Sequence, residues 1–383
     1  MNIQTFNKIS PFGLDILKDA GFEIDNGSDP VGAMVRSAKL HEEQFPKSLL
    51  AIARAGAGTN NIPVDRCASE GIVVFNTPGA NANAVKELVL AGLLLSSRRV
   101  VQGIEWAKTL KGKGDEVGPA VEKGKSAFVG PEIKGKTLGI IGLGAIGVLV
   151  ANAANHLGMK VVGYDPFLSI ESAWNLTHSA TRAKNIEEIY KTCDYITIHV
   201  PLNDETRGFI NKQTIDMMKP GVRILNFARG ELVNSKDLIA ALEEGKVASY
   251  VTDFPNDEVI GVDGVIAIPH LGASTPESED NCAKMAAEEL VDYIQNGNIN
   301  HSVNMPNITL ARQGNKRICV IHKNIPNMIS QIAGALSGIN IENMLNKSKG
   351  EYAYSMLDVA DCDDKAVNDI LTAIDGVIRI RII

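Results

Sequence analysis

The sequence predicts an α/β protein in which two open parallel sheets are followed by a smaller α+β domain. Three observations lead to this prediction. Short apolar runs rich in β-branched residues alternate with longer helical patterns through most of the chain, as in parallel sheets covered by helices. A glycine-rich loop joins a strand to a helix near residue 142. Near the C-terminal end the order becomes βαββαβ, which folds as a separate α+β sandwich.

The N-terminal part contains three candidate strands, in the apolar runs at residues 34–35, 50–53 and 72–75. Loop sequences rich in Gly, Asn and Pro follow the second and third of these runs. Two longer helical patterns, 85–97 and 275–297, are expected to carry the chain to the central domain and back. We therefore predict a flavodoxin-like domain made of residues 1–97 and 275–305.

Length and composition narrow the class of protein. A chain of 383 residues is too long for one ordinary core, so two or three domains are expected. A net charge of −7 without a basic run argues against a nucleic-acid partner. The sequence shows no secretory signal and no apolar stretch that could span a membrane, so we expect a cytoplasmic protein. Its five cysteines form no CxxC pair, so we expect neither a metal site nor disulfides.

The glycine-rich loop lies between a strand at 138–141 and a helix that opens with Ala145 and Ile146. In such loops the first glycine makes the tight turn, the second admits a pyrophosphate, and the third lets helix pack on strand. Gly142, Gly144 and Gly147 occupy these places. The N-terminus of the helix adds N–H donors and positive potential for the phosphates.

A second apolar run, 159–164, ends at Asp165, 18 residues after Gly147. A carboxylate there accepts from both ribose hydroxyls and repels a 2′-phosphate, so the expected cofactor is NAD and not NADP. Further strands are expected at 195–200, 222–227 and 265–268. Together they predict a doubly wound Rossmann domain over residues 98–274.

Two residues with catalytic potential follow strands of this domain. Arg229 lies after the 222–227 run and His270 after the 265–268 run, with an acidic stretch, 253–258, between them. Oxidation of an alcohol needs a base for the hydroxyl proton, and histidine suits that task. An arginine suits a substrate carboxylate, and a carboxylate beside the imidazole would orient it. Singly each is usually a surface or loop residue, but after a nucleotide-binding loop they indicate a dehydrogenase site.

The motifs GLGAIG, HVPLNDETRGFIN, NFARGELV and PHLGAST together resemble the D-isomer-specific 2-hydroxyacid dehydrogenases. Residues 53–98 resemble the branch of that family that oxidises 3-phospho-D-glycerate in serine biosynthesis. The resemblance implies NAD-dependent oxidation of this substrate to 3-phosphooxypyruvate. Two alternatives stay open: another D-2-hydroxy acid as substrate (glycerate, lactate or 2-oxoglutarate), or a non-catalytic, NAD-sensing binding protein.

The resemblance also implies roles for particular residues. Arg229, His270 and an intervening acid form the catalytic set, and two alignments of the family's D-V-F-x-x-E-P motif compete for that acid. If Phe254 is aligned with the Phe of the motif, the catalytic acid is Asp257. If residues are instead counted from Arg229 without a gap, the acid is Glu258, which we prefer. The implied NAD contacts are Thr77, Ala145, Ile146, Asp165, Val200, Phe227, Ala228, Asp253, Gly272 and Ala273. The implied substrate contacts are Arg54, Ala55, Gly56, Ala57, Gly58, Asn81 and Asn83, with Arg36 or Lys39 as further partners of the phosphate.

Residues 301–315 read as a linker, and the βαββαβ tail at 312–383 resembles an ACT domain, a small regulatory module. In the family His322, Asn324 and Asn340 correspond to residues that bind the effector L-serine. Asn327 replaces the usual glycine of the loop, and a ligand-free dimerisation module is the alternative. Residues 103–135 are polar and glycine-interrupted, typical of an excursion over a surface or onto a partner subunit. With exposed ACT edge strands, this favours a homo-oligomer.

Overall fold

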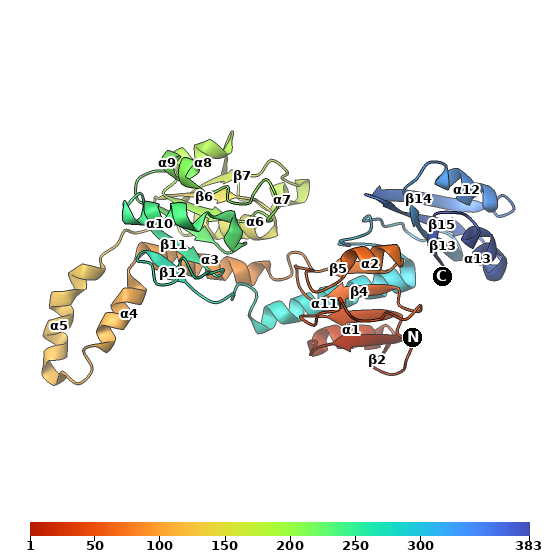
Figure 1. Ribbon diagram of the computed structural model, residues 1–383, viewed down its shortest axis with the longest axis horizontal. Coiled ribbons are helices and arrows are strands. Elements are labelled where there is room, and N and C mark those ends of the chain that lie inside the picture. Colours follow the sequence, from red (N-terminus) through yellow and green to blue (C-terminus); the bar gives the residue numbers. More distant parts are fainter. The chain divides into compact units, whose positions relative to one another are not determined.

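The computed structural model describes all 383 residues and divides by its internal contacts into two compact units. The first unit contains residues 1–81 and 276–383, and the second contains residues 82–275 (Figure 1). The predicted fold class is confirmed, because both units contain a parallel sheet with helices and the first also contains an antiparallel sheet.

The parallel sheet of the first unit has the strand order β2-β1-β3-β4-β5. Its strands are β1 (Asn2–Phe6), β2 (Glu23–Ile24), β3 (Gly32–Val35), β4 (Ala51–Arg54) and β5 (Val73–Asn76). Its helices are α1 (Pro11–Asp19), α2 (Val64–Ser69) and the long α11 (Pro276–Asn296). Ser10 caps α1 by accepting from the Phe12 N–H, and Pro11 takes the first helical position, which needs no N–H. Helix α1 packs along α11.

The second sheet of this unit is antiparallel, in the order β14-β15-β13-β16. Its elements are β13 (Lys316–Lys323), α12 (Met328–Ala335), β14 (Ile341–Lys349), β15 (Tyr352–Val359), α13 (Asp364–Thr372) and β16 (Val377–Ile382). They follow the predicted βαββαβ order. One face packs on α12 and α13, whereas the other shares a core with the parallel sheet. In that core Tyr354 and Met356 join Phe75 and Tyr293.

Polar contacts from the antiparallel sheet cap the C-terminal end of α11, where a helix leaves carbonyl groups without partners. Arg381 donates to the carbonyls of Tyr293 (3.1 Å) and Ile294 (2.6 Å). Arg317 donates to the Asn296 carbonyl at 2.8 Å. Cations at this position also favour the helix dipole, so these two arginines join the sheet firmly to α11.

Arg317 is itself fully buried and forms a two-pronged ion pair with the equally buried Asp358, at 2.6 and 2.9 Å. Burial alone would raise the pKa of Asp358. The hydrogen bonds from Arg317 and from the Gln313 N–H outweigh burial, so the pKa of Asp358 lies below its ordinary value. All the hydrogen-bonding capacity of this carboxylate therefore serves the structure.

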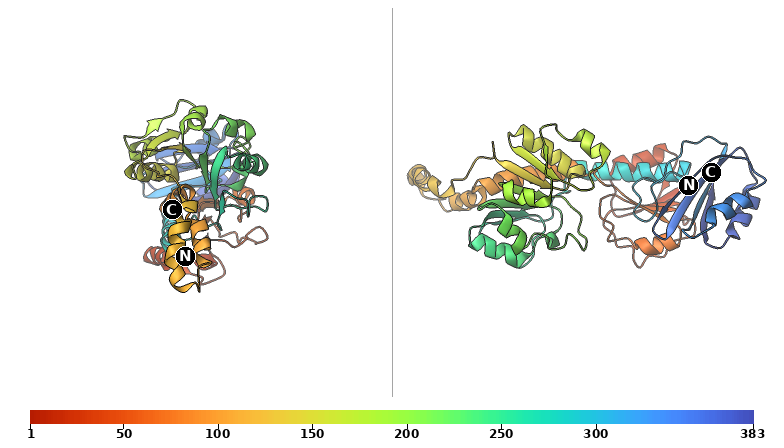
Figure 2. Two further views of the ribbon diagram at one scale, coloured as in Figure 1. Left: turned by 90° about the vertical axis from the view of Figure 1, so that its left-hand side faces the viewer. Right: turned by 90° about the horizontal axis from the view of Figure 1, so that it is seen from above.

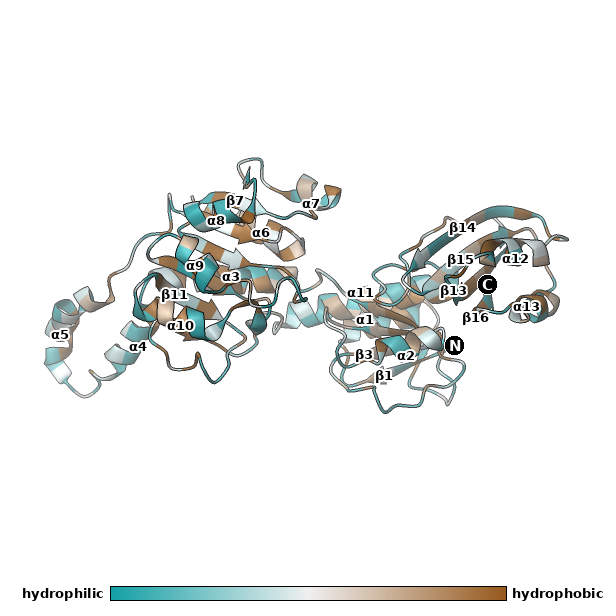
Figure 3. Cartoon of the chain, turned by 45° about the horizontal axis from the view of Figure 1, so that its top comes forward, coloured by the Kyte–Doolittle hydropathy of each residue, from teal (hydrophilic) through white to brown (hydrophobic).

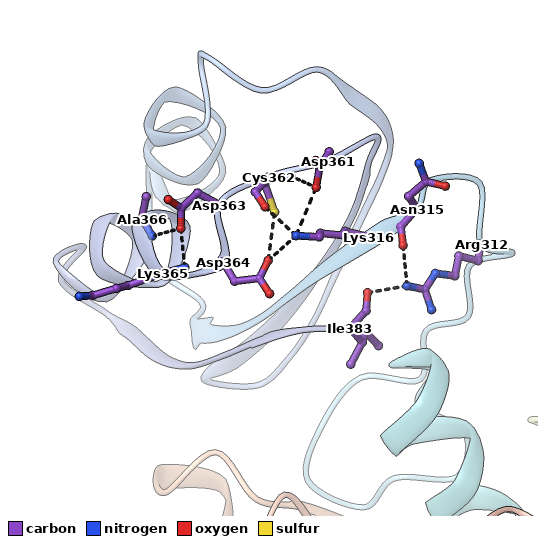
Figure 4. A network of polar contacts seen from close by, with 10 residues as sticks. All are labelled: Arg312, Asn315, Lys316, Asp361, Cys362, Asp363, Asp364, Lys365, Ala366 and Ile383. Atoms are coloured by element: carbon purple, nitrogen blue, oxygen red, sulfur yellow. Dashed lines mark hydrogen bonds and ion pairs between the residues drawn. The ribbon is translucent and has the colours of Figure 1, made fainter.

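The start of the antiparallel sheet is fixed by a second network, on its solvent side (Figure 4). The ammonium of Lys316 donates to the Cys362 carbonyl and to the carboxylates of Asp361 and Asp364, at 2.7 to 3.2 Å. Asp363 caps α13 by accepting from the N–H groups of residues 365 and 366. The pKa of the Lys316 ammonium is raised by its hydrogen bonds to the two carboxylates.

Glu289 is a buried acid on α11, only 7% exposed. One carboxyl oxygen lies 2.9 Å from Nδ1 of His301, and the other has no hydrogen-bond partner. Burial, with a smaller contribution from Glu288, raises the pKa of Glu289 from 4.5 to about 9. The acid is therefore protonated at neutral pH.

The second unit is built on a seven-stranded sheet in the order β12-β11-β10-β9-β6-β7-β8, with every pairing parallel. Its strands are β6 (Thr137–Ile141), β7 (Lys160–Tyr164), β8 (Thr181–Arg182), β9 (Tyr195–Ile198), β10 (Val222–Asn226), β11 (Val247–Thr252) and β12 (Val265–Ala267). Its helices are α3 (Ala82–Ser97), α6 (Ala145–His156), α7 (Ile170–Asn175), α8 (Ile186–Thr192), α9 (Lys212–Met217) and α10 (Ser235–Glu243), with a 3₁₀ turn, η3 (Gly230–Leu232). Helices α3 and α6 cover one face, and α8, α9 and α10 cover the other.

Helix α3 packs on α6 and on β10 and β11, so its contacts belong to the second unit. The sequence assigned residues 82–97 to the flavodoxin-like domain, whereas the contacts divide the chain just before this helix. The reason lies in its apolar face, where Val85, Val89 and Leu93 join the core that covers β6 and β10.

Residues 103–135 are expected to make an excursion over a surface or onto a partner subunit, and most of that stretch lies in the helical segments of residues 100–128. These segments are α4 (Val100–Lys108), η1 (Gly114–Glu116), α5 (Val117–Gly124) and η2 (Lys125–Phe128), which extend from the rest of the unit as an arm (Figures 1 and 2). The rings of Trp106 and Phe128 hold the two legs of the arm together at 5.3 Å. Neither α4 nor α5 buries a residue, and several valines of the arm are exposed.

Colouring by hydropathy shows apolar segments concentrated in the strands (Figure 3). None of the helices has the length and apolar content needed to cross a bilayer. Four strands, β1, β2, β8 and β11, were not predicted from the sequence. Strands β1 and β11 include polar residues such as Gln4 and Ser249, which obscure the apolar pattern, and β2 and β8 are only two residues long.

Candidate active site

The glycine-rich loop lies where β6 passes into α6, and its backbone requires the glycines. Gly142 has φ +94°, and a Cβ there would lie 2.5 Å from the His199 carbonyl oxygen. A Cβ on Gly147 would lie 2.0 Å from the Gly142 carbonyl oxygen, so this glycine lets the helix start close to the strand. A Cβ on Gly144 would meet nothing within 4 Å, which leaves its backbone open to a ligand.

Asp165, one residue beyond β7, organises the neighbouring loop. Its carboxylate accepts from the N–H of Leu143 and from the N–H of Phe167, each at 2.8 Å. Asp165 also lines a cavity of about 320 Å³ with Leu143, Leu168, Leu176 and Arg182. The predicted acid therefore lies beside the glycine loop, next to an apolar space of ligand size.

The carboxyl ends of β9, β10, β11 and β12 bring the other predicted residues of this unit to one edge of the sheet, because the strands are parallel. Val200 follows β9, whereas Phe227 and Ala228 follow β10. Gly272 and Ala273 lie in the loop between β12 and α11. Phe227 is buried against Gly92 of α3.

Asn226, which sequence reasoning missed, shapes the loop that carries Arg229. It is fully buried, donates to the Arg229 carbonyl at 2.8 Å and accepts from the Ala228 N–H at 3.2 Å. A polar residue as the last member of an apolar strand was the available signal, because a buried amide needs partners. The Arg229 guanidinium donates to the Ala228 carbonyl and lies 5.4 Å from the centre of the Phe254 ring.

His270 and Asp253 lie at the same edge. The His270 ring is exposed and its centre is 4.3 Å from that of Phe254, so the phenyl ring contacts both His270 and Arg229. Asp253 is 1% exposed; its Oδ2 accepts from the Gly272 N–H at 3.1 Å, while Oδ1 is buried without a partner. Burial raises the pKa of Asp253, although Gly272 and the positive charges of His270 and Arg229 oppose the rise.

The two candidate acids, Asp257 and Glu258, lie in an exposed turn after β11. No hydrogen bond or ion pair joins either side chain to His270. The choice between them stays a prediction. Asp253 is the first residue after β11, whose last residue, Thr252, pairs with Asn226.

In the first unit, the predicted substrate residues 54–58 comprise the last residue of β4 and the loop that follows it. This loop is hydrogen-bonded to the residues after β5. Arg54 donates to the Arg36 carbonyl at 3.2 Å, and Arg36 pairs with Glu279 at the start of α11. The loop is tied to β5, because the N–H of the buried Thr77 donates to the Gly56 carbonyl at 3.2 Å. Asn81 ends this unit, whereas Asn83 lies in α3 of the second unit, where it bonds Glu87.

No hydrogen bond joins the predicted effector residues to one another. His322 is 2% exposed, and its Nε2 lies 3.2 Å from Asn346 Oδ1 and 3.0 Å from Ser355 Oγ. Asn324 instead donates to the Gly350 carbonyl, and Asn340 is exposed before β14. Asn346 and Ser355 were missed, because only the register of β13, β15 and β14 brings them beside His322. Asn327 adopts φ +70°, the conformation that glycine would take there.

No group of three or more His, Cys, Asp or Glu side chains is arranged to hold a metal ion. All five cysteines are free, and four of them are buried. The predicted side chains at the carboxyl edge of the second unit are a guanidinium, an imidazole and a buried carboxylate.

Comparison with known proteins adds an independent finding. Residues 90–272 match the model of the NAD binding domain of D-isomer specific 2-hydroxyacid dehydrogenases. A D-3-phosphoglycerate dehydrogenase of Haemophilus influenzae is 34% identical over 355 residues, which cover 89% of this chain and 82% of that protein. The Bacillus subtilis D-3-phosphoglycerate dehydrogenase is 36% identical over 285 residues. This chain spans about half the length of that relative (52%).

Among solved structures, the crystal structure of NAD⁺-bound 3-phosphoglycerate dehydrogenase from Entamoeba histolytica is similar, with a TM-score of 0.61. The two are 29% identical, and the match covers 79% of this chain and 98% of that one. A D-mandelate dehydrogenase of Rhodotorula graminis, at 24% identity and a TM-score of 0.67, shares the fold.

Proposed function

This chain belongs to the D-isomer-specific 2-hydroxyacid dehydrogenase family, and we propose that it oxidises 3-phospho-D-glycerate to 3-phosphooxypyruvate. The cofactor expected from the sequence, NAD, is confirmed by the family match and by a structural neighbour with NAD⁺ bound. The observation that carries the proposal is the edge of the second unit's sheet, where Arg229, His270 and Asp253 lie around Phe254. These groups are the cation, base and buried acceptor that alcohol oxidation beside a nicotinamide requires.

The residues of the second unit fit NAD. The backbone at Gly144 is open for a pyrophosphate, and α6 begins one residue later with its N–H groups unpaired. Asp165 stands where the ribose hydroxyls are recognised in such domains. The buried, unpartnered Oδ1 of Asp253 needs a donor, which the carboxamide N–H of a nicotinamide supplies.

Bound NAD supplies the hydride acceptor. In the proposed reaction the Arg229 guanidinium binds the carboxylate of the substrate through paired hydrogen bonds. His270 takes the proton of the C2 hydroxyl, the general-base role that histidine fills most often in enzymes. Glu258, or Asp257 in its place, would reach the imidazolium and stabilise its charge. Phe254 contacts both working side chains and restrains their positions.

The 54–58 loop supports a phosphorylated substrate. Arg54 is the last residue of β4, and the loop that follows leaves the Ala57 N–H as a donor, because the N–H groups of Ala55 and Gly56 already donate to backbone carbonyls. Arg36 is beside it, although paired with Glu279, and Lys39 follows in the same segment. Two arginines on adjacent strands are the chemistry that a dianionic phosphate ester selects.

The test is NADH formation with 3-phosphoglycerate, D-glycerate and D-lactate as substrates. We expect turnover confined to the phosphorylated substrate. Arg54→Gln should raise its KM by about tenfold or more with a smaller change in kcat, since a charge-assisted contact is worth roughly 1.5–3 kcal/mol. Lys18→Gln, which removes an exposed charge from α1, is the control. NAD binding without turnover of any of these substrates would contradict the proposed dehydrogenase activity and favour a non-catalytic NAD-sensing role.

We also propose that L-serine inhibits this reaction by binding at the predicted effector residues His322, Asn324 and Asn340. Imidazole and amide groups can pair with an amino acid's carboxylate and ammonium. Inhibition by serine that disappears in His322→Ala, with turnover kept, would support this. Inhibition unchanged in His322→Ala would refute the assigned site.

A homo-oligomer is proposed on the exposed valines of the α4–α5 arm and on the open edge strand β14. Sedimentation of the full chain tests it. A monomer at micromolar concentration would contradict the proposal. The free cysteines are consistent with a cytoplasmic setting, which we also propose.

A further inference from the structure

A second cavity of the nucleotide-binding unit has no place in the proposed reaction. It encloses about 320 Å³ at the amino ends of β10, β11 and β12, whereas the nucleotide loop and His270 lie at the carboxyl edge. Its other walls come from the end of α3, the start of α4 and the chain that returns from the arm. The volume is within the range of small-molecule sites.

Three neighbouring strands place polar side chains in one row beneath this cavity. Arg223 on β10 pairs in register with Tyr195 on β9 and with Ser249 on β11. The β10–β11 ladder shifts by one residue at this point: Val222 pairs with Val247, and Arg223 pairs with Ser249. Without this bulge Ala248 would face Arg223. Bulges often re-aim a side chain for a purpose, and here the bulge sets a hydroxyl beside a guanidinium.

The Arg223 guanidinium is held on two sides and open on the third. Its Nε donates to the Ser96 carbonyl at 2.8 Å, and Nη1 donates to the Gly221 carbonyl at 3.3 Å. Its central carbon lies 5.4 Å from the centre of the Tyr195 ring, whose hydroxyl is fixed by Ser97 at 2.8 Å. Nη2 has no partner in the structure. The group is thus pre-positioned, with one donor edge unused.

Ser249 is the second unused donor. It is only 6% exposed, yet its hydroxyl forms no hydrogen bond. Arg99 adds a positive charge at the rim, 3.9 Å from the exposed Asp263. Most of the remaining wall is apolar, contributed by Leu95, Val129, Leu242, Val247 and Ile266. The Ser249 hydroxyl and the unused guanidinium edge of Arg223 both line the cavity, so a ligand there can accept from both.

We propose that this cavity binds a small molecule through an oxyanion, carboxylate or phosphate, which accepts from Arg223 Nη2 and Ser249 Oγ. Arg99 contributes attraction at the entrance, and the apolar wall receives the body of the ligand. The site is separate from the proposed active site and does not depend on the assigned substrate.

Calorimetric titration of the full chain with inorganic phosphate, and separately with malonate, tests this site at low ionic strength. An Arg54→Gln, Arg229→Gln background saturated with NAD removes the arginines that the proposed function assigns to the phosphate and the carboxylate of the substrate. We expect Ser249→Ala to weaken binding about tenfold, the effect of losing one hydrogen bond to a charged group. Lys236→Gln, an exposed charge on α10 without a partner, is the matched control and should bind like its parent.

Arg223→Gln should abolish binding, with its circular dichroism checked against the parent. If Arg223→Gln misfolds, Ser249→Ala still tests the site, because the serine hydroxyl forms no hydrogen bond within the chain and its loss should not disturb the fold. Binding of phosphate alone, or of malonate alone, would identify the class of oxyanion. Equal affinity in Ser249→Ala and its parent, an equal loss in Lys236→Gln, or no binding of either anion would overturn the proposal.

Discussion

Two buried carboxylates, Asp253 in the nucleotide-binding unit and Asp358 in the antiparallel sheet, have opposite surroundings. Asp358 receives two hydrogen bonds from Arg317 and one from a backbone N–H, and its pKa is lowered. Asp253 receives one backbone hydrogen bond, keeps a buried oxygen without a partner, and its pKa is raised by burial. Both are almost completely inaccessible.

The difference separates polar groups that hold the fold from those that wait for a ligand. Around Asp358 every charge is balanced within the chain, as a permanent buried ion pair requires. Around Asp253 the balance is incomplete, and nearby Arg229 and His270 keep donors free. Substitutions around Asp253 should therefore lower catalytic activity, whereas substitutions around Asp358 should lower the free energy of unfolding.

The largest effect is expected at the incomplete region. His270→Gln should lower kcat by roughly 10²–10⁴-fold, the usual contribution of a general base. The unfolding midpoint should change little, because the His270 side chain is exposed. Steady-state NADH formation and urea unfolding measure the two quantities. Turnover within a few-fold of the parent would remove His270 from the mechanism.

At the balanced region the expectation is reversed. Asp358→Ala should destabilise the first unit by about 3–5 kcal/mol, because it leaves the Arg317 charge buried and unpaired. The double variant Arg317→Met, Asp358→Leu should recover much of that loss, since no isolated charge remains. Urea midpoints of the full chain provide the measurement. A single variant as stable as the parent would show that water reaches the pair.

Two glycines sharpen the contrast within one loop. Gly147→Ala should destabilise the second unit by about 1–3 kcal/mol, because its Cβ would overlap the Gly142 carbonyl. Gly144→Ala should leave stability unchanged, yet weaken NAD binding roughly tenfold, or about 1.4 kcal/mol. Thermal unfolding without ligand and NAD titration separate the two outcomes. Equal effects of both variants on unfolding would contradict the distinction.

The smallest effect concerns Glu289, a buried acid with one partner. Its folded-state pKa of about 9 exceeds its unfolded value, so the folded chain holds a proton that the unfolded chain releases. Stability should therefore fall as pH rises above about 5, by at most ~1.4 kcal/mol for each pH unit, and Glu289→Gln should reduce the fall. Over the single unit from pH 5 to 6 we expect a loss of about 1 kcal/mol. Parallel pH profiles of the two chains would contradict this.

The sequence predicted best what local sterics decide. Gly142 and Gly147 occupy positions that no other residue fits, so their spacing revealed the loop, and Asp165 followed at a fixed distance. The βαββαβ order could also be predicted, because its strands are short apolar runs separated by turns. The helices of the arm at 100–128 could not be predicted, because its glycines disfavour helix formation. The contact between the Trp106 and Phe128 rings, which joins the two legs of the arm, is not visible in the sequence.

Contacts between distant segments lay beyond the sequence. An amphipathic helix such as α3 shows the same pattern whichever sheet it covers, so its unit could not be assigned. His322 meets Asn346 and Ser355 only through the register of three strands. Only one oxygen of Asp253 has a hydrogen-bond partner, the Gly272 N–H in the loop after β12. The sequence does not show where that loop passes, so the unpartnered oxygen could not be predicted.

The discontinuity of the first unit has a consequence for biosynthesis. Residues 1–81 leave the ribosome early, but their core contains Tyr354 and Met356, and α11 is capped by Arg381. Residues 82–275 lie between these segments, and at 5–20 residues per second their synthesis takes roughly 10–40 s. The second unit can fold as it emerges, whereas the first waits with an open apolar face. Nascent chains of this protein should therefore depend on chaperones chiefly through their first segment.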